Sequence, residues 1–530
     1  MAVRSMILLF VGLGLFTGCS TSRIVHDAEY VELSHAAERA VSLNAEETVN
    51  PVVSQLAGPH AVEEYIQVAI SQNPEIQAAR KRLEAAAYQV PVAASLEDPM
   101  LNLSVQPAPV QTAAGEQRTI LSANQKFPWF GKLDRRGSQA ESQTDVMRAE
   151  LAVTELAVIE QVRRAYYELY FIQQAVAVTE EEQKLLAEIR DVANARYKAN
   201  QTSQQDVLRA ELEISNVQNE LIRLRQQLES SQAALARLLH IAPQTKVRAL
   251  DKLPASQIAL ELESLQKQAV SARPELHARL AALDRDRQGV ELALLEYKPD
   301  VTVGLSWIAV DDEGLSRVAD GQDTVMLMAG INLPVYRNRL DSQVRSAEAK
   351  AVAAARDYDA IRDATLAQVV DLFAKIQSQR DLLTLFEEEI LPRARQTLEV
   401  SARAYNVGEV DFLQLLDNWR QLLRYEIAYR RIDASLRQTL VELERVVGGD
   451  FGPLPVPVEN VPPDAKPMAP APEPNATEQP QEKENLDRTN DEQSLNRGDQ
   501  KPTMALAPTH GSHRRPPSRL VSPTSYGKEN

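Results

Sequence analysis

Two very long helical segments dominate the pattern of apolar and polar positions along the chain. The segment 138–242 contains neither glycine nor proline, and its first part, Ser138 to Tyr197, would span about 90 Å as one α-helix. A short polar break at 198–203 predicts an antiparallel hairpin. The returning helix carries apolar or small residues in alternating steps of three and four, which predicts knobs-into-holes packing. These positions are Val207, Ala210, Ile214, Val217, Leu221, Leu224, Leu228, Ser231, Leu235 and Leu238.

Four shorter runs instead alternate apolar and polar residues with a period of two. They lie at about 98–107, 119–127, 299–309 and 324–333. Such alternation is typical of strands in a membrane barrel, and equally of a half-buried soluble hairpin. Four strands cannot close a barrel, whereas three chains would supply twelve. The polar segments 107–118 and 308–323 would then form outward-facing loops.

The chain is an internal duplication, and the two halves keep the same order of elements. Asn73-Pro74-Glu75-Ile76 recurs as Arg273-Pro274-Glu275-Leu276, each followed by a helical segment, two strands and a long helical hairpin. We therefore expect repeats over 58–250 and 251–450, in a mainly α fold with a small β part. In the second repeat Pro392 interrupts the long helix, which predicts a kink or a local break.

The two ends of the chain differ from the repeats. Residues 1–18 have the charged start and the apolar run of a secretory signal, which is too short for a comfortable membrane span. The signal ends before Cys19, which resembles the bacterial lipoprotein pattern and predicts a lipidated, outer-membrane-sorted lead over 19–57. An ordinary signal with a chance cysteine is the alternative. The proline-rich composition of 451–530 predicts a disordered tail.

Composition and motifs exclude several classes of protein. A net charge of −16 gives little support to nucleic-acid binding. The single cysteine excludes an intrachain disulfide, and we expect no metal site and no cofactor; His510 and His513 read as solvated tail residues. No nucleotide-binding, serine-hydrolase or zinc-protease motif is present. We therefore do not expect an enzyme.

Over about 60–450 the chain resembles the TolC-like outer-membrane efflux family. The resemblance rests on the order of the duplicated elements, on the Phe127-Pro128-Trp129-Phe130-Gly131-Lys132 segment, and on Glu389-Ile390-Leu391-Pro392. The Phe127–Lys132 segment is similar to the metal-cation branch of the family. The resemblance implies a homotrimer with a twelve-stranded outer-membrane barrel and a helical barrel in the periplasm. It also implies a periplasmic adaptor and an inner-membrane pump that supplies the energy.

The function implied is a passive, lipid-anchored exit duct from the periplasm to the exterior. Two alternatives stay open from the residues themselves. One is a non-conducting coiled-coil lipoprotein that spaces the envelope, and the other is the duct of a protein secretion system. The transported substrate, whether metal ions, drugs or protein, is not assigned.

The resemblance also points to the hairpin tips as the functional site. It places acidic residues at a closed periplasmic entrance, and Asp206 and Asp417 are the matching candidates. Exposed helix carboxylates without such a role are the alternative. Basic side chains could hold a closed entrance together. The candidates for this restraint are Arg209, Arg403 and Arg420, and the candidates for shaping the tips and meeting an adaptor are Tyr197, Asn200, Tyr405 and Gly408. For Tyr197 and Tyr405, simple packing between helices is the alternative. Asn200 replaces the usual glycine but readily adopts the same left-handed conformation.

Overall fold

The computed structural model describes most of both repeats. The described residues are 27, 30, 31, 56–253 and 261–449, except 313, 316, 317, 319 and 320. The predicted signal 1–18, Cys19, most of the lead and the tail 451–530 lie outside the described residues. Their assignments stay predictions.

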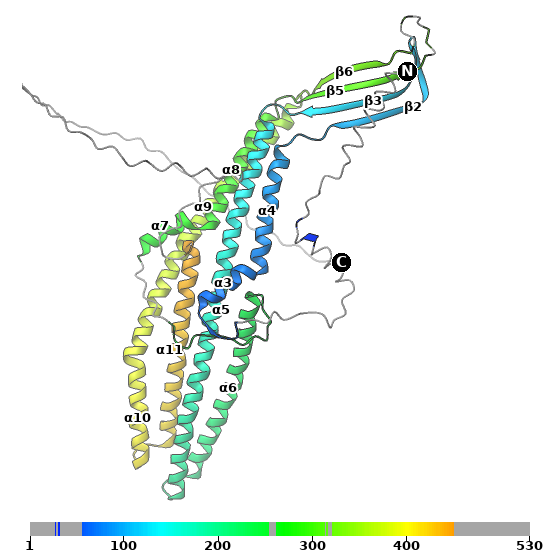
Figure 1. Ribbon diagram of the computed structural model, residues 1–530. Coiled ribbons are helices and arrows are strands. Elements are labelled where there is room, and N and C mark those ends of the chain that lie inside the picture. Colours follow the sequence, from blue (N-terminus) through cyan, green and yellow to red (C-terminus); the bar gives the residue numbers. More distant parts are fainter. Residues whose placement is uncertain are drawn as a thin grey trace, which may run out of the picture. The chain divides into compact units, whose positions relative to one another are not determined.

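The first repeat contains the long helical hairpin that the sequence predicts. Helix α5 (Lys132–Lys198) has 67 residues and α6 (Gln204–Leu238) returns along it (Figure 1). None of the predicted seam positions of α6 is exposed, and most are buried. The coiled-coil reading of this seam is therefore confirmed.

The second repeat contains a matching hairpin with an interrupted first helix. Helix α9 (Arg337–Leu385) passes into the π-turn η1 (Phe386–Ile390), then into α10 (Leu391–Val407), and α11 (Phe412–Val447) returns. Pro392 lies in the first turn of α10. Because proline lacks an N–H, one carbonyl of the preceding turn loses its helical partner, and the wider π-turn accommodates that loss. The predicted local break is confirmed.

A pair of shorter helices opens each repeat. These helices are α3 (Val62–Gln72) and α4 (Pro74–Ala94) in the first, and α7 (Leu262–Ala272) and α8 (Pro274–Leu295) in the second. Asn73 caps α4, since its side chain accepts a hydrogen bond from the Glu75 N–H at 2.8 Å and donates one to the Leu238 carbonyl at 2.9 Å. Arg273 provides no side-chain cap for α8.

The four predicted strands form one antiparallel sheet. They are β2 (Met100–Thr112), β3 (Gly115–Phe127), β5 (Val301–Val310) and β6 (Thr324–Ile331), in the order β2-β3-β5-β6 (Figure 1). The central pair β3–β5 joins the two repeats, for example through Leu121 opposite Trp307.

The predicted loop 107–118 is wrong, because most of it is strand. Strand β2 continues through Pro107 and Pro109 after a register shift between Val105 and Val110, and only a tight turn separates it from Gly115. The prolines are tolerated because β2 lies at the edge of the sheet, where an N–H need not enter the ladder. A β-carbon on Gly115 would lie 1.7 Å from the Asp311 carbonyl oxygen, so this turn requires glycine.

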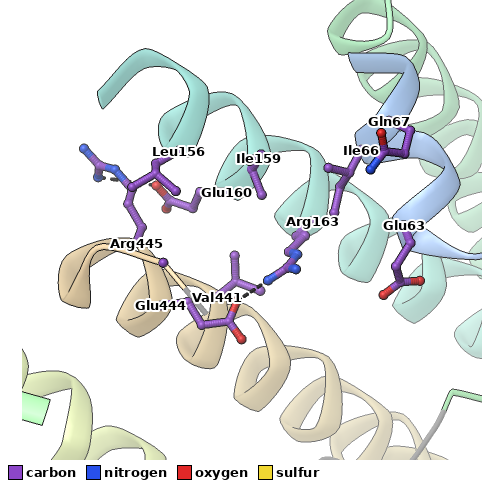
Figure 2. Close-up of a pocket in the computed structure, with 11 residues that line it drawn as sticks. Glu63, Ile66, Gln67, Leu156, Ile159, Glu160, Arg163, Val441, Glu444 and Arg445 are labelled. Carbon is purple, nitrogen blue, oxygen red and sulfur yellow. Dashed lines mark hydrogen bonds and ion pairs between the residues drawn. The ribbon is translucent and has the colours of Figure 1, made fainter. Parts of the chain in front are cut away.

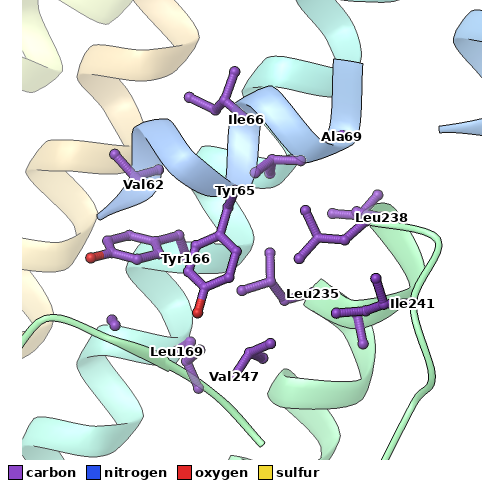
Figure 3. Close-up of a cluster of buried hydrophobic side chains, with 14 of the residues drawn as sticks. Val62, Tyr65, Ile66, Ala69, Tyr166, Leu169, Leu235, Leu238, Ile241 and Val247 are labelled. Carbon is purple, nitrogen blue, oxygen red and sulfur yellow. The ribbon is translucent and has the colours of Figure 1, made fainter. Parts of the chain in front are cut away.

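Three buried clusters hold the described helices together. One joins α3, α5 and α6 to a two-stranded parallel sheet of β1 (Gly58–His60) and β4 (Val247–Ala249), which the sequence did not predict. Its centre is the Tyr65–Tyr166 pair, with ring centroids 5.9 Å apart (Figure 3). The Tyr65 hydroxyl donates to the Arg248 carbonyl at 3.0 Å. A second cluster lies between the two hairpins, and a third joins α7, α9 and α11.

Charged side chains join the repeats beside the first cluster. A cavity of about 270 Å³ lies between α3, α5 and the end of α11, and Figure 2 shows Arg163 and Glu444 paired across it. Arg445 bonds Glu160 of the first repeat at 3.3 Å and Glu275 of the second at 3.4 Å. None of the described helices is both long and apolar enough to cross a membrane.

Candidate functional site: the tips of the two helical hairpins

The first tip is a compact turn between α5 and α6. Asn200 has a φ of 58°, so it adopts the predicted left-handed conformation. The Asn200 N–H donates to the Tyr197 carbonyl at 3.0 Å, and the Gln201 N–H donates to the Arg196 carbonyl at 2.9 Å. Ser203 then caps α6 by accepting from the Gln205 N–H. These bonds satisfy the last carbonyls of α5 and reverse the chain.

The second tip uses glycine for the same purpose. Gly408 has a φ of 85°, and its N–H donates to the Tyr405 carbonyl at 3.1 Å. The Glu409 N–H donates to the Ala404 carbonyl at 2.9 Å. The two repeats therefore end their outgoing helices with the same hydrogen-bond pattern, and one residue in each is left-handed.

The two tips contact each other through Tyr405. Its ring is 3% exposed, and the Arg196 guanidinium lies over it, 4.7 Å from the ring centroid. On the other side its ring centroid lies 5.5 Å from that of Phe412. Burial raises the pKa of the Tyr405 hydroxyl, and the negative charge of Asp206 adds to the increase. Tyr405 therefore packs a neutral side chain between the ends of both hairpins.

Asp206 is buried within the chain, beside the first tip. Its exposed fraction is 8%, and the Thr202 hydroxyl donates to its carboxylate. It lies in the first turn of α6, where the helix dipole favours a negative charge. Within one chain, Asp206 therefore holds the turn and shapes the surroundings of Tyr405.

Asp417 is exposed and takes part in a bridge between the repeats. Arg420 lies 3.2 Å from Asp417 on α11 and reaches α6, where it binds both carboxylate oxygens of Glu213 at 2.7 and 2.9 Å. Hydrogen bonds from Arg420 hold the pKa of Glu213 below its ordinary value, in spite of burial. A forked guanidinium–carboxylate pair of this kind is strong and directional.

The other two predicted basic residues do not reach the acidic candidates. Arg403 pairs with Glu399 one turn away on its own helix, and both side chains are exposed. Arg209 makes no ion pair with any residue of the described ranges. Only Arg420, of the three, therefore links the two repeats near the tips, and its partner Glu213 was not predicted.

A second charged contact joins the repeats where the strands meet the helices. The Lys132 side chain is fully buried, and its Nζ lies 2.7 Å from the Asp300 carboxylate. Asp300 also accepts the Trp129 N–H at 3.0 Å. This pair explains why a lysine ends the Phe127–Lys132 segment. The sequence carries one signal for Asp300, because it lies just before the first strand of the second repeat, as Asp98 lies just before the first strand of the first repeat.

The described residues contain no group of three or more His, Cys, Asp or Glu side chains that could hold a metal ion.

The model of the outer membrane efflux protein family matches residues 65–239 and 265–449, which are more than half of the chain. The chain belongs to the outer membrane efflux protein family. The two matched segments fall within the two predicted repeats. As an outer membrane efflux protein, the chain is an exit duct of the outer membrane that passes the substrates of an efflux system from the periplasm to the exterior.

Relatives and solved structures agree with this assignment. The chain is 24% identical over 394 residues to the cobalt-zinc-cadmium resistance protein CzcC of Cupriavidus metallidurans, covering 74% of this chain and 91% of the relative. It is 23% identical over 339 residues to the pyoverdine export outer membrane protein OpmQ of Pseudomonas putida, covering 62% and 70%. The crystal structure of the outer membrane protein VceC of Vibrio cholerae shares the fold, with a TM-score of 0.61, 20% identity and coverage of 74% and 97%.

Proposed function

We propose that three copies of this efflux protein close their sheets into one twelve-stranded barrel. The observation that supports this is the open sheet itself, in which β2 and β6 each have one unpaired edge within the chain. All eight residues of β6 are exposed, and Leu103 and Leu327 are 66% and 78% exposed. Unpaired edges are costly in lipid, and apolar outward faces suit it. Pairing β2 of one copy with β6 of the next removes every edge.

The helical hairpins of the three copies would form the periplasmic part of the duct. Apolar side chains stay exposed near both tips, including Leu208 and Leu212 on α6 and Val407 and Leu413 at the second tip. Exposed apolar patches of this kind mark interaction surfaces. We infer that the helical tip of a periplasmic adaptor docks here, with Tyr197 and Asn200 beside it, and that the adaptor connects the duct to an inner-membrane pump.

The tips would also form the gate. Asp417 is the exposed acid of the predicted pair, so three copies of it would concentrate negative charge at the entrance and favour cations. Asp206, Tyr405 and Arg420 would instead hold the two hairpins of one chain together in the closed state. Opening would then require the Arg420–Glu213 bridge to lengthen or break.

We propose metal cations as the cargo, since one relative is named for cobalt, zinc and cadmium resistance and the proposed entrance is acidic. We propose also that lipidated Cys19 anchors the chain to the outer membrane. Tolerance to zinc and cobalt in cells that lack the gene, with and without the restored chain, tests the cargo. Unchanged tolerance would exclude these metals.

Single-channel recording of the purified trimer in a planar bilayer tests the duct and the gate together. We expect uniform steps that prefer cations, and a weaker cation preference in Asp417→Asn. Glu211→Gln removes the same charge from an exposed position of α6 and should leave the preference unchanged. Silence from verified trimers, in wild type and in a tip-loosened Tyr405→Ala variant, would contradict the duct. Equal effects of the Asp417 and Glu211 variants would contradict the gate.

A further inference from the structure

A groove of about 880 Å³ lies between α5, α10 and α11, beside the π-turn at Pro392. Much of its lining is apolar or aromatic. The residues include Val178, Leu185, Leu398, Leu422 and Tyr429. The volume is that of a site for a drug-sized molecule, and such sites combine an apolar lining with a few placed polar groups.

Glu182 is the polar group that distinguishes this groove. It lines the groove from α5, its exposed fraction is 6%, and its Oε2 atom has no hydrogen-bond partner among the described residues. The indole Nε1 of the fully buried Trp419 also makes no hydrogen bond of ordinary geometry, although it lies close enough to Glu182 to oppose the increase in the pKa of that carboxyl. A buried carboxylate oxygen without a well-formed hydrogen bond is costly, and such atoms in native proteins generally have a role.

Neither guanidinium of the groove forms an ion pair with Glu182, although the charge of Arg395 lowers the pKa of its carboxyl slightly. Five carboxylates and two guanidiniums line the groove. Arg395 of α10 is committed to Glu426 of α11, with contacts of 2.7 and 3.1 Å. Arg430 lies against the Tyr429 ring, 5.6 Å from its centroid. The remaining carboxylates are Glu181 on α5, Glu387 in the π-turn, and Glu399, which pairs with Arg403 outside the groove.

We propose that this groove binds an amphipathic organic cation, whose ammonium group pairs with Glu182 while its apolar part packs against the leucines and Tyr429. The excess of negative charge attracts a cation and repels an anion. A charged hydrogen bond to Glu182 would satisfy the unpaired oxygen. The site lies on the helical shafts, apart from the tips, and does not depend on the proposed gate.

Binding at this site should depend on pH. Burial raises the pKa of Glu182 to about 7, and the Glu426 carboxylate adds to the increase. The free site is therefore mostly neutral at pH 6 and mostly ionised at pH 8. If the cation binds the ionised form, its apparent affinity should increase roughly tenfold between these values.

Dansylcadaverine is a suitable probe, because it joins a fluorescent aromatic group to a primary ammonium that stays charged up to pH 8. Energy transfer from Trp419 to the dansyl group would report binding to the detergent-purified full-length protein. We expect saturable transfer in wild type, roughly tenfold weaker binding in Glu182→Gln, and loss of the pH dependence in that variant. The N-acetylated, uncharged probe should bind as weakly to wild type as the charged probe binds to Glu182→Gln.

Glu181→Gln is the matched control, since it removes an exposed carboxylate from the same groove and should change affinity little. Size-exclusion profiles and thermal unfolding verify that each variant is folded. Absence of saturable binding in wild type would overturn the proposal, as would equal binding in wild type and Glu182→Gln. Should Glu182→Gln fail to fold, a wild-type affinity that is constant from pH 6 to 8 would overturn it as well.

Discussion

The Lys132–Asp300 pair offers the sharpest test of how the sheet is attached to the helices. Replacing Lys132 by methionine keeps much of the apolar stem and removes the charge. Breaking a buried pair by removing one partner costs about 3–5 kcal/mol, because the other charge is left uncompensated. Asp300 keeps the Trp129 N–H at 3.0 Å and Lys126 at 3.6 Å. We therefore expect the lower end of that range, about 3 kcal/mol.

Hydrogen–deuterium exchange measures this loss where it occurs. A local destabilisation of about 3 kcal/mol corresponds to roughly hundredfold faster exchange of the protected amides near Lys132 and Asp300. The double variant Lys132→Met with Asp300→Asn should exchange more slowly than Lys132→Met alone, because the one carboxylate left without its lysine is then Glu296, which is partly exposed. Lys126 is 42% exposed, so Lys126→Met should change the opening free energy by less than about 1 kcal/mol. Equal effects of the Lys126 and Lys132 variants, or a double variant no milder than the single one, would refute the reasoning.

Three further predictions concern turns, caps and pH. Gly408→Ala should lower stability by about 1–2 kcal/mol in thermal unfolding, because the residue is left-handed and a β-carbon would lie 3.3 Å from Arg196. Asn73→Ala should cost about 2 kcal/mol by the same assay, since it loses the cap of α4 and leaves the Leu238 carbonyl unpaired. An effect below about 0.5 kcal/mol, which is typical of a surface substitution, would contradict this prediction. The pKa of Glu213 is lowered in the folded protein, so the ionised carboxylate stabilises the fold. This stabilisation is complete above the ordinary pKa of about 4.3 and is lost as pH falls through the lowered value. Hydrogen–deuterium exchange at the tips should therefore accelerate below about pH 4 in wild type but not in Glu213→Gln.

Much of the fold follows from the sequence because its elements are set by local periodicity. The absence of glycine and proline over 138–242 and the heptad seam of α6 specify a long hairpin, whatever packs against it. Pro392 specifies the break through its missing N–H. The extension of β2 through Pro107 and Pro109 could not be foreseen, because an edge strand tolerates proline only once its place in the sheet is known.

The candidate site was less accessible from the sequence because its contacts join distant positions. Asp206 and Asp417 look alike as helix carboxylates, yet one is 8% exposed and the other has a side chain that is 61% exposed. In the sequence, Glu182 of α5 and Glu213 of α6 also look like surface residues, because each lies in a helix rich in charge. Only the packing of α11 against the first hairpin reveals that Glu213 has a forked partner and that Glu182 has no ion-pair partner.

The charged pairs between the repeats share a physical role that the apolar seams cannot fulfil. A heptad seam packs almost as well after a slip of seven residues, whereas a buried ion pair after such a slip leaves two unpaired charges. Charged pairs between the repeats, buried to different degrees, recur where the strands meet the helices, at the end of α11 and near the tips. They are Lys132–Asp300, Arg163–Glu444 and Arg420–Glu213. We infer that they fix the register of one repeat against the other.

Exchanging the two charges of the pair near the tips tests this role of register. Arg420→Glu alone places two carboxylates together on α6 and α11, and Glu213→Arg alone places two guanidiniums together, so each should speed exchange at the tips roughly tenfold or more. Combining the two substitutions restores an attractive pair and should recover most of the protection. The recovery should be incomplete, because Asp417, which lies 3.2 Å from Arg420, would repel a glutamate at that position. The contrary outcome is that the combined variant loses as much protection against exchange as the two single variants lose together. In that case the pair would act through side-chain shape and not through charge, and register would have to come from the apolar seams alone.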